Sequence, residues 1–131
     1  MKKQNTKYYL PIIEPKNVYI SEVDPNDYEN MLKLLYKKLQ CNIVEKVNFN
    51  DKYDFIIDEE GTFKEHNLGY SLPNFPNKYF QNQPFFGKST IVKIKENKEG
   101  EIYWTCFDDF KELSDVLIKY INKQRIYKKT D

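Results

Sequence analysis

The side chains best suited to holding a ligand lie between Glu65 and Phe86, where aromatic residues are interspersed with asparagine and glutamine. Aromatic rings stack on bases, and carboxamides read ring edges by donating and accepting hydrogen bonds, so this mixture suits a nucleotide or a single strand. We predict a binding site there, in which aromatic residues stack and the asparagine and lysine contact polar edges. Its members are Tyr70, Asn74, Tyr79, Phe80, Phe86 and Lys88.

The same composition also fits a long loop that is pinned to a core by its aromatic residues. At roughly 20 residues, such a loop is longer than a compact domain usually carries without a functional or structural reason. The sequence leaves two interpretations of this segment, a pinned loop and a loop open to a ligand.

Groups that could catalyse a reaction are few. Residues 58–61 contain three carboxylates that could bind a divalent cation or act as general acids, but Asp-Glu-Glu-Gly also fits a type I turn. His66 is the only histidine, and neither Ser71 nor Ser89 lies in a nucleophile elbow. We therefore predict no catalytic residue, no metal and no cofactor, and a protein that is not an enzyme.

Glycines and cysteines add no motif. The four glycines are scattered singly, so the chain has neither a P-loop nor a dinucleotide-binding loop. Cys41 and Cys106 stand alone, which argues against a zinc site and against a disulfide framework. We expect two small buried thiols in a reducing compartment.

Length and charge limit the class of protein. The 131 residues match one domain, which we expect to span residues 1–131 with residues 1–6 and 125–131 frayed. Because the net charge is only +1, binding of nucleic acid would require a local basic patch. No stretch approaches the roughly 18 apolar residues of a membrane span, so we expect a soluble protein of the cytoplasm. The basic residues near the C-terminus could form a patch that holds phosphates, but a solvated tail is the favoured interpretation: Lys119, Lys123, Arg125, Lys128 and Lys129.

Runs of β-branched and aromatic residues bounded by turn signals predict three hairpins. Their strands are expected at residues 7–13 and 17–23, at about 43–49 and 53–57, and at 86–95 and 101–107. A short returning strand is expected at residues 62–64.

Two amphipathic helices are predicted from apolar residues three and four positions apart. The first is expected from Pro25 to Gln40, with Asp24 as its N-cap. The second is expected from about Asp109 to Lys123, and its Asp-x-x-Glu start is a capping-box signature.

Together these elements predict an α+β fold, an antiparallel sheet of five to six hairpin-linked strands with the two amphipathic helices packed on it. The economical arrangement places both helices on one face of the sheet. The opposite face is then exposed or covered by a second copy of the chain, so we expect a homodimer.

Several short motifs resemble those of an uncharacterised family of small phage, prophage and plasmid proteins. The matching residues are Leu39-Gln40, Val44-Glu45, Asp58 to Gly61, Leu72-Pro73 and Gly87 to Val92. Asn74 follows Pro73 directly, whereas the family has one residue between its proline and asparagine. A glycine pair of the family is absent, since Cys41-Asn42 stands in that region. The resemblance covers about two thirds of the chain and implies a mobile-element origin without an established enzymatic activity.

Proteins of that kind often act by binding. The leading hypothesis is therefore a phage-type accessory protein of the host cytoplasm that counters a host defence system by binding a host protein or by sequestering a nucleotide signal. The alternative is a nucleic-acid-binding accessory protein of a mobile element, whose affinity would fall steeply with salt. A nucleotide-processing enzyme, dependent on His66 or Glu59, ranks third.

Overall fold

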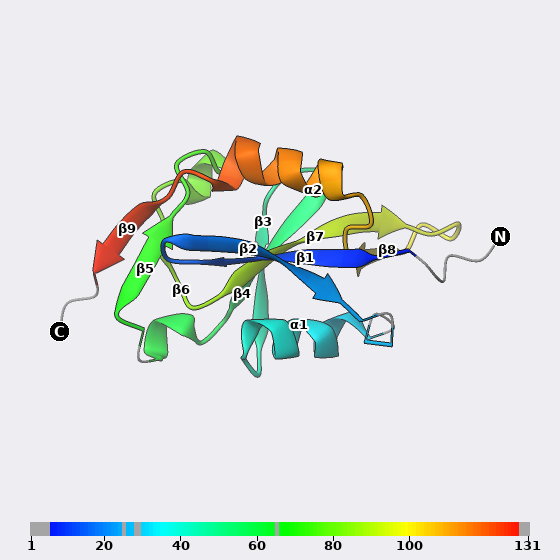
Figure 1. The fold of residues 1–131 in the computed structure, drawn as a ribbon, viewed down its shortest axis with the longest axis horizontal. Coiled ribbons are helices and arrows are strands. Elements are labelled where there is room, and N and C mark those ends of the chain that lie inside the picture. The colour runs from blue at the N-terminus through cyan, green and yellow to red at the C-terminus, as the bar shows by residue number, and fades with distance from the viewer. Residues whose placement is uncertain (1–5, 25, 28–29, 65, 129–131) are drawn as a thin grey trace.

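The computed structural model describes residues 6–24, 26–27, 30–64 and 66–128, apart from the side chain of residue 63. It confirms the predicted α+β class (Figure 1). Six described strands form the main sheet in the order β2-β1-β7-β4-β3, with β8 also beside β7, and every pairing is antiparallel. These strands are β1 (Tyr8–Glu14), β2 (Asn17–Val23), β3 (Val44–Asn48), β4 (Tyr53–Asp58), β7 (Ser89–Glu96) and β8 (Ile102–Thr105).

All three predicted hairpins are present, as β1–β2, β3–β4 and β7–β8. The first turns at Lys16 and the last at Gly100, both of which adopt a positive φ (66° and 84°). Gly87 also has a positive φ (83°), and it interrupts the strand that was expected to begin at Phe86. Phe86 consequently belongs to a second sheet.

The second sheet has the order β6-β5-β9 in the described residues. It consists of β5 (Leu68–Ser71), β6 (Phe85–Phe86) and β9 (Arg125–Lys128). The expectation that residues 125–131 fray is therefore wrong for 125–128, because these residues pair with β5. Residues 129–131 and 1–5 lie outside the described part. The strand expected at 62–64 is also wrong, because Gly61–Phe63 forms a 3-10 turn.

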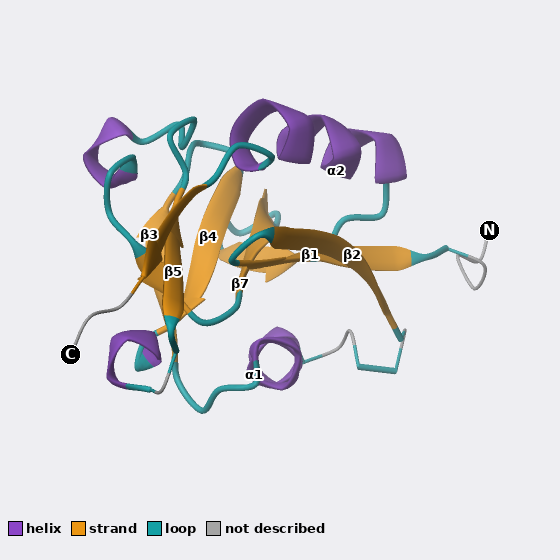
Figure 2. Cartoon of the chain, turned by 60° about the vertical axis from the view of Figure 1, so that its left-hand side comes forward, coloured by secondary structure: helices purple, strands orange, loops and turns teal. Residues whose placement is uncertain are grey.

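The two helices, α1 (Met31–Leu39) and α2 (Phe110–Val116), cover opposite faces of the main sheet (Figures 1 and 2). Successive residues of a strand point to opposite faces, so Phe55 of β4 packs in the core under α2 while Ile56 packs in the core under α1. The placement of both helices on one face is wrong. The homodimer was predicted because one face of the sheet was expected to be exposed. Since the two helices cover both faces, that reason no longer applies.

The helix starts differ in how well they were predicted. Asp109 caps α2 as expected and accepts hydrogen bonds from the backbone N–H groups of Lys111 (3.0 Å) and Glu112 (3.3 Å). A π-helical turn, Leu117–Ile121, continues α2. Asn30 rather than Asp24 caps α1, by accepting from the N–H of Lys33 (3.1 Å). The predicted first residue, Pro25, lies outside the described residues.

Gln40 ends α1 in the left-handed conformation (φ 53°, ψ 52°), which is strained for a residue with a Cβ. Replacing Gln40 by glycine should raise the free energy of unfolding by about 0.5–1 kcal/mol, because the strain relieved exceeds the entropy that glycine adds to the unfolded chain. Urea denaturation measures this. Gln40→Ala is the control and should show no gain, and equal stabilities of the two variants would contradict the prediction.

Candidate functional site

The segment from His66 to Phe86 is pinned to the core under α2. Tyr70, Leu72, Phe75 and Phe85 are all buried there. The ring of Phe75 meets Phe49 edge-on at 4.8 Å between centroids and Phe55 at 5.1 Å. Of the two interpretations of this segment, the pinned loop is therefore the one that the structure supports.

Polar contacts fix the loop between its buried rings. The side-chain amide of Gln81 donates to the carbonyl of Phe75 (2.9 Å), and that of Asn77 donates to the carbonyl of Asn48 in β3 (3.2 Å). The Asn77 side-chain oxygen accepts from the N–H of Tyr79 (3.1 Å) and caps the 3-10 turn Lys78–Phe80. We call residues 72–84 the Tyr79 loop.

Three of the predicted stacking residues are packed against the protein itself. Tyr70 is fully buried, and its hydroxyl lies within hydrogen-bond distance of Ser89 and of the carbonyl of Ile13, so its prediction as a ligand-contacting residue is wrong. Burial raises the pKa of the Tyr70 hydroxyl. Phe80 is half-buried against Phe75, 6.0 Å between ring centroids. Phe86 is also half-buried, and its ring lies where a Cβ on Gly69 would be.

Lys88 lies apart from the Tyr79 loop. Its ammonium group is 3.9 Å from a carboxylate oxygen of Glu14, and both residues line a pocket of about 360 Å³ that includes His66 and Gly87. The Nε2 atom of His66 is buried and meets no hydrogen-bond partner in the described residues. The six predicted residues therefore do not surround one pocket.

Tyr79 and Asn74 are the two predicted residues that remain exposed. The side chain of Tyr79 is 84% exposed, although its ring meets Phe80 edge-on at 5.0 Å. Polar and small residues surround Tyr79 on the loop and are exposed as well: Lys78, Asn82, Gln83 and Pro84. The loop thus displays one aromatic ring on a fixed base.

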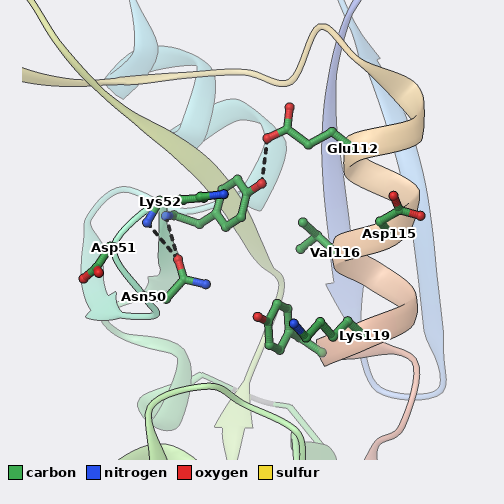
Figure 3. A pocket seen from close by; sticks show the side chains of 9 residues that line it. Asn50, Asp51, Lys52, Glu112, Asp115, Val116 and Lys119 are labelled. Carbon is green, nitrogen blue, oxygen red and sulfur yellow. Dashed lines mark hydrogen bonds between the residues drawn. The ribbon is translucent and has the colours of Figure 1, made fainter.

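A second candidate is a pocket of about 390 Å³ between α2 and the turn that precedes β4 (Figure 3). Tyr53 and Glu112 line this pocket, and the Tyr53 hydroxyl donates to Oε2 of Glu112 (2.6 Å). Lys93, which is not part of the lining, donates to Oε1 (2.9 Å). The sequence pattern assigned Glu112 to the capping box of α2. Nothing in the local sequence indicates that its carboxylate turns to β4 and β7 instead.

Both carboxylate oxygens of Glu112 are engaged by the protein. Burial alone would raise the pKa of Glu112, but the hydrogen bonds from Tyr53 and Lys93 outweigh it and leave this pKa below its ordinary value. Burial and the neighbouring carboxylate raise the pKa of Tyr53. The group is therefore suited to fastening α2 to the sheet rather than to transferring protons near neutral pH.

Other sites considered from the sequence are explained by folding. Asp58 accepts from the N–H of Glu60 (2.9 Å), as the turn requires, and pairs with Lys64 (2.6 Å). Cys41 and Cys106 are buried, and burial raises the pKa of both thiols, that of Cys106 to about 12. In the described ranges, no group of three or more His, Cys, Asp and Glu side chains could hold a metal ion.

The helices within the described residues are all too short or too polar to cross a membrane. Comparison of the chain with protein-family models, with curated proteins and with solved structures finds no match.

Proposed function

We propose that this chain is a non-enzymatic binding protein that docks on a protein partner through the Tyr79 loop. The observation that carries the proposal is the 84% exposed ring of Tyr79 on a loop whose base, at Phe75, is fully buried. Apart from its edge-on contact with Phe80, this exposed ring contributes little to folding.

Two physical features favour a protein partner. Tyrosine brings a large contact area with few rotatable bonds, and a fixed loop loses little further entropy when it binds. The surrounding Asn74, Asn82 and Gln83 can both donate and accept hydrogen bonds, which resembles the composition of antibody binding loops. The Tyr79 loop thus combines an aromatic anchor with an adaptable polar rim.

The resemblance to small phage and prophage proteins supports a partner from a host defence system, met in the host cytoplasm. A nucleotide signal is the less supported ligand, because Tyr70, Phe80 and Phe86 pack against the protein rather than around an open pocket.

The test is a quantitative pull-down from host cells that express the wild-type chain, Tyr79→Ala or Tyr103→Ala at equal levels. Tyr103 is also exposed (48%) but lies on β8, so its variant is the matched control. We expect a protein that wild type and Tyr103→Ala recover equally and Tyr79→Ala loses. With that protein purified, Tyr79→Ala should weaken the affinity about 30-fold, as at a binding hot spot.

Thermal unfolding of Tyr79→Ala should differ little from wild type, since the ring is exposed. Equal recovery by both variants would contradict the proposal. Recovery of a nucleotide, or of nucleic acid in a salt-sensitive manner, without a protein would do so as well, and would favour the corresponding alternative function.

A further inference from the structure

Three described strands of the main sheet, β2, β3 and β8, each pair with a single neighbour, and β8 is protected by its length of only four residues. β3 carries exposed Glu45 and Lys46 at its centre, which discourages pairing with another strand. β2 is seven residues long, has β1 as its only neighbour among the described strands, and carries one charged residue, Glu22, near its end. The β2 edge therefore lacks the usual protection.

The backbone groups of β2 that point away from β1 belong to Val18, Ile20 and Glu22. Tyr9 exchanges both backbone hydrogen bonds with Phe107, so its partner in β2, Glu22, must point its own N–H and C=O away from β1. The direction of the backbone N–H and C=O groups alternates along a strand, so those of Ile20 and Val18 also point away from β1. Lys38 reaches the carbonyl of Glu22 from that side (3.4 Å).

The strand is self-complementary about Tyr19. In an antiparallel pair of two β2 strands centred there, Val18 of each copy faces Ile20 of the partner subunit, and both residues have outward-pointing backbone groups. Lys16, in the turn just before β2, then lies near Glu22 of the partner subunit, so opposite charges come close at both ends. A register centred on Ile20 would instead set Val18 against the partner's Glu22.

Two large apolar side chains of α2 and its π-helical continuation are exposed, and these helical turns lie over β1 and β2 (Figure 2). Phe110 is 54% exposed and contacts Tyr9 at 5.6 Å between ring centroids, and Ile118 is 66% exposed. Glu112, Asp115 and Lys119 of the same helical segment instead line the pocket shown in Figure 3. Gln124 accepts from the N–H of Lys16 (2.8 Å), so the chain just after this helix is tied to the β1–β2 turn (Figure 1).

We propose that two copies of this chain form a homodimer by antiparallel pairing of their β2 strands. The two-fold axis is perpendicular to the joined sheet, so both copies of α2 lie on the same face and can shield the exposed Phe110 and Ile118. Asn77 ties the Tyr79 loop to β3, at the opposite edge, so pairing leaves Tyr79 accessible in both copies.

Sedimentation of the full chain tests the assembly, and wild type should form a dimer of 15.9 kDa subunits. Ile20→Pro removes the outward N–H without removing a bond to β1, and it should give a monomer. Ile20→Ala removes the same side-chain contacts but keeps that N–H, so it is the matched control and should remain a dimer.

A charge reversal tests the register even if Ile20→Pro fails to fold. Lys16 lies in the turn before β2 and Glu22 near the far end of the strand, so they can meet only between copies. Lys16→Glu should weaken dimerisation about tenfold, and adding Glu22→Lys should restore it, although Glu22 also loses its exposed pair with Lys7 (3.8 Å). Wild type that stays monomeric at every concentration would overturn the proposal, as would a dimer unaffected by the charge reversal.

Discussion

Replacement of Phe75 by alanine is expected to lower the free energy of unfolding by about 3–5 kcal/mol and to release the Tyr79 loop. The ring is fully buried and contacts Phe49, Phe55 and Phe85. Its removal leaves a cavity among side chains that are fixed by the sheet and by each other. Urea denaturation followed by circular dichroism measures the loss.

Two further variants distinguish rings that stabilise the loop by packing from the ring that is exposed to solvent. Phe80→Ala should cost less than Phe75→Ala because its ring is only half-buried, and Tyr79→Ala should change the free energy of unfolding by less than about 0.5 kcal/mol. Similar losses for Phe75→Ala and Tyr79→Ala would contradict the view that one ring anchors the loop and the other is displayed.

Replacement of Glu112 by alanine is expected to lower the free energy of unfolding by about 2 kcal/mol, because a half-buried carboxylate that accepts hydrogen bonds from Tyr53 and Lys93 is lost. Lys93 is only 14% exposed, and without Glu112 its nearest carboxylate would be that of Asp108 at 4.0 Å. The Tyr53 hydroxyl would also lose its acceptor. Asp115→Ala is the control, since the pair of Asp115 with Lys111 lies in solvent and should contribute little to stability.

The contribution of Glu112 should also depend on pH. Its pKa in the folded protein is below its ordinary value, so the stabilisation is complete above the ordinary pKa and is lost as pH falls through the folded pKa. Glu112→Gln should therefore be less stable than wild type at neutral pH, with a difference that shrinks in acid. Thermal unfolding across that range measures it, and a difference that grows in acid would contradict the assignment.

Local sequence patterns predict most of the main sheet. Alternating apolar residues and turn residues such as Gly100 specify the three hairpins, and Asp109 specifies the start of α2. The sequence patterns do not predict the second sheet, because β6 has only two residues and β9 only four. Neither strand is long enough to show a period.

The sequence does contain an indication that the two helices lie on opposite faces of the sheet. Tyr53 to Ile57 is almost continuously apolar, and such a strand is typical of a sheet covered on both faces. The site was less accessible to prediction. Tyr70 and Tyr79 were both predicted as ligand contacts because both are tyrosines in the same segment. Which ring of a loop is buried depends on tertiary contacts such as that between Phe49 and Phe75, which are distant in sequence.

The central claim is that the exposed ring of Tyr79 meets a protein partner. Site-specific incorporation of a photocrosslinking phenylalanine analogue at position 79, and separately at position 103, tests it in the host cell. We predict a discrete covalent adduct with one host protein from position 79 and none from position 103. Absence of an adduct at position 79 in cells where the wild-type chain is active, or the same adduct from both positions, would contradict the claim.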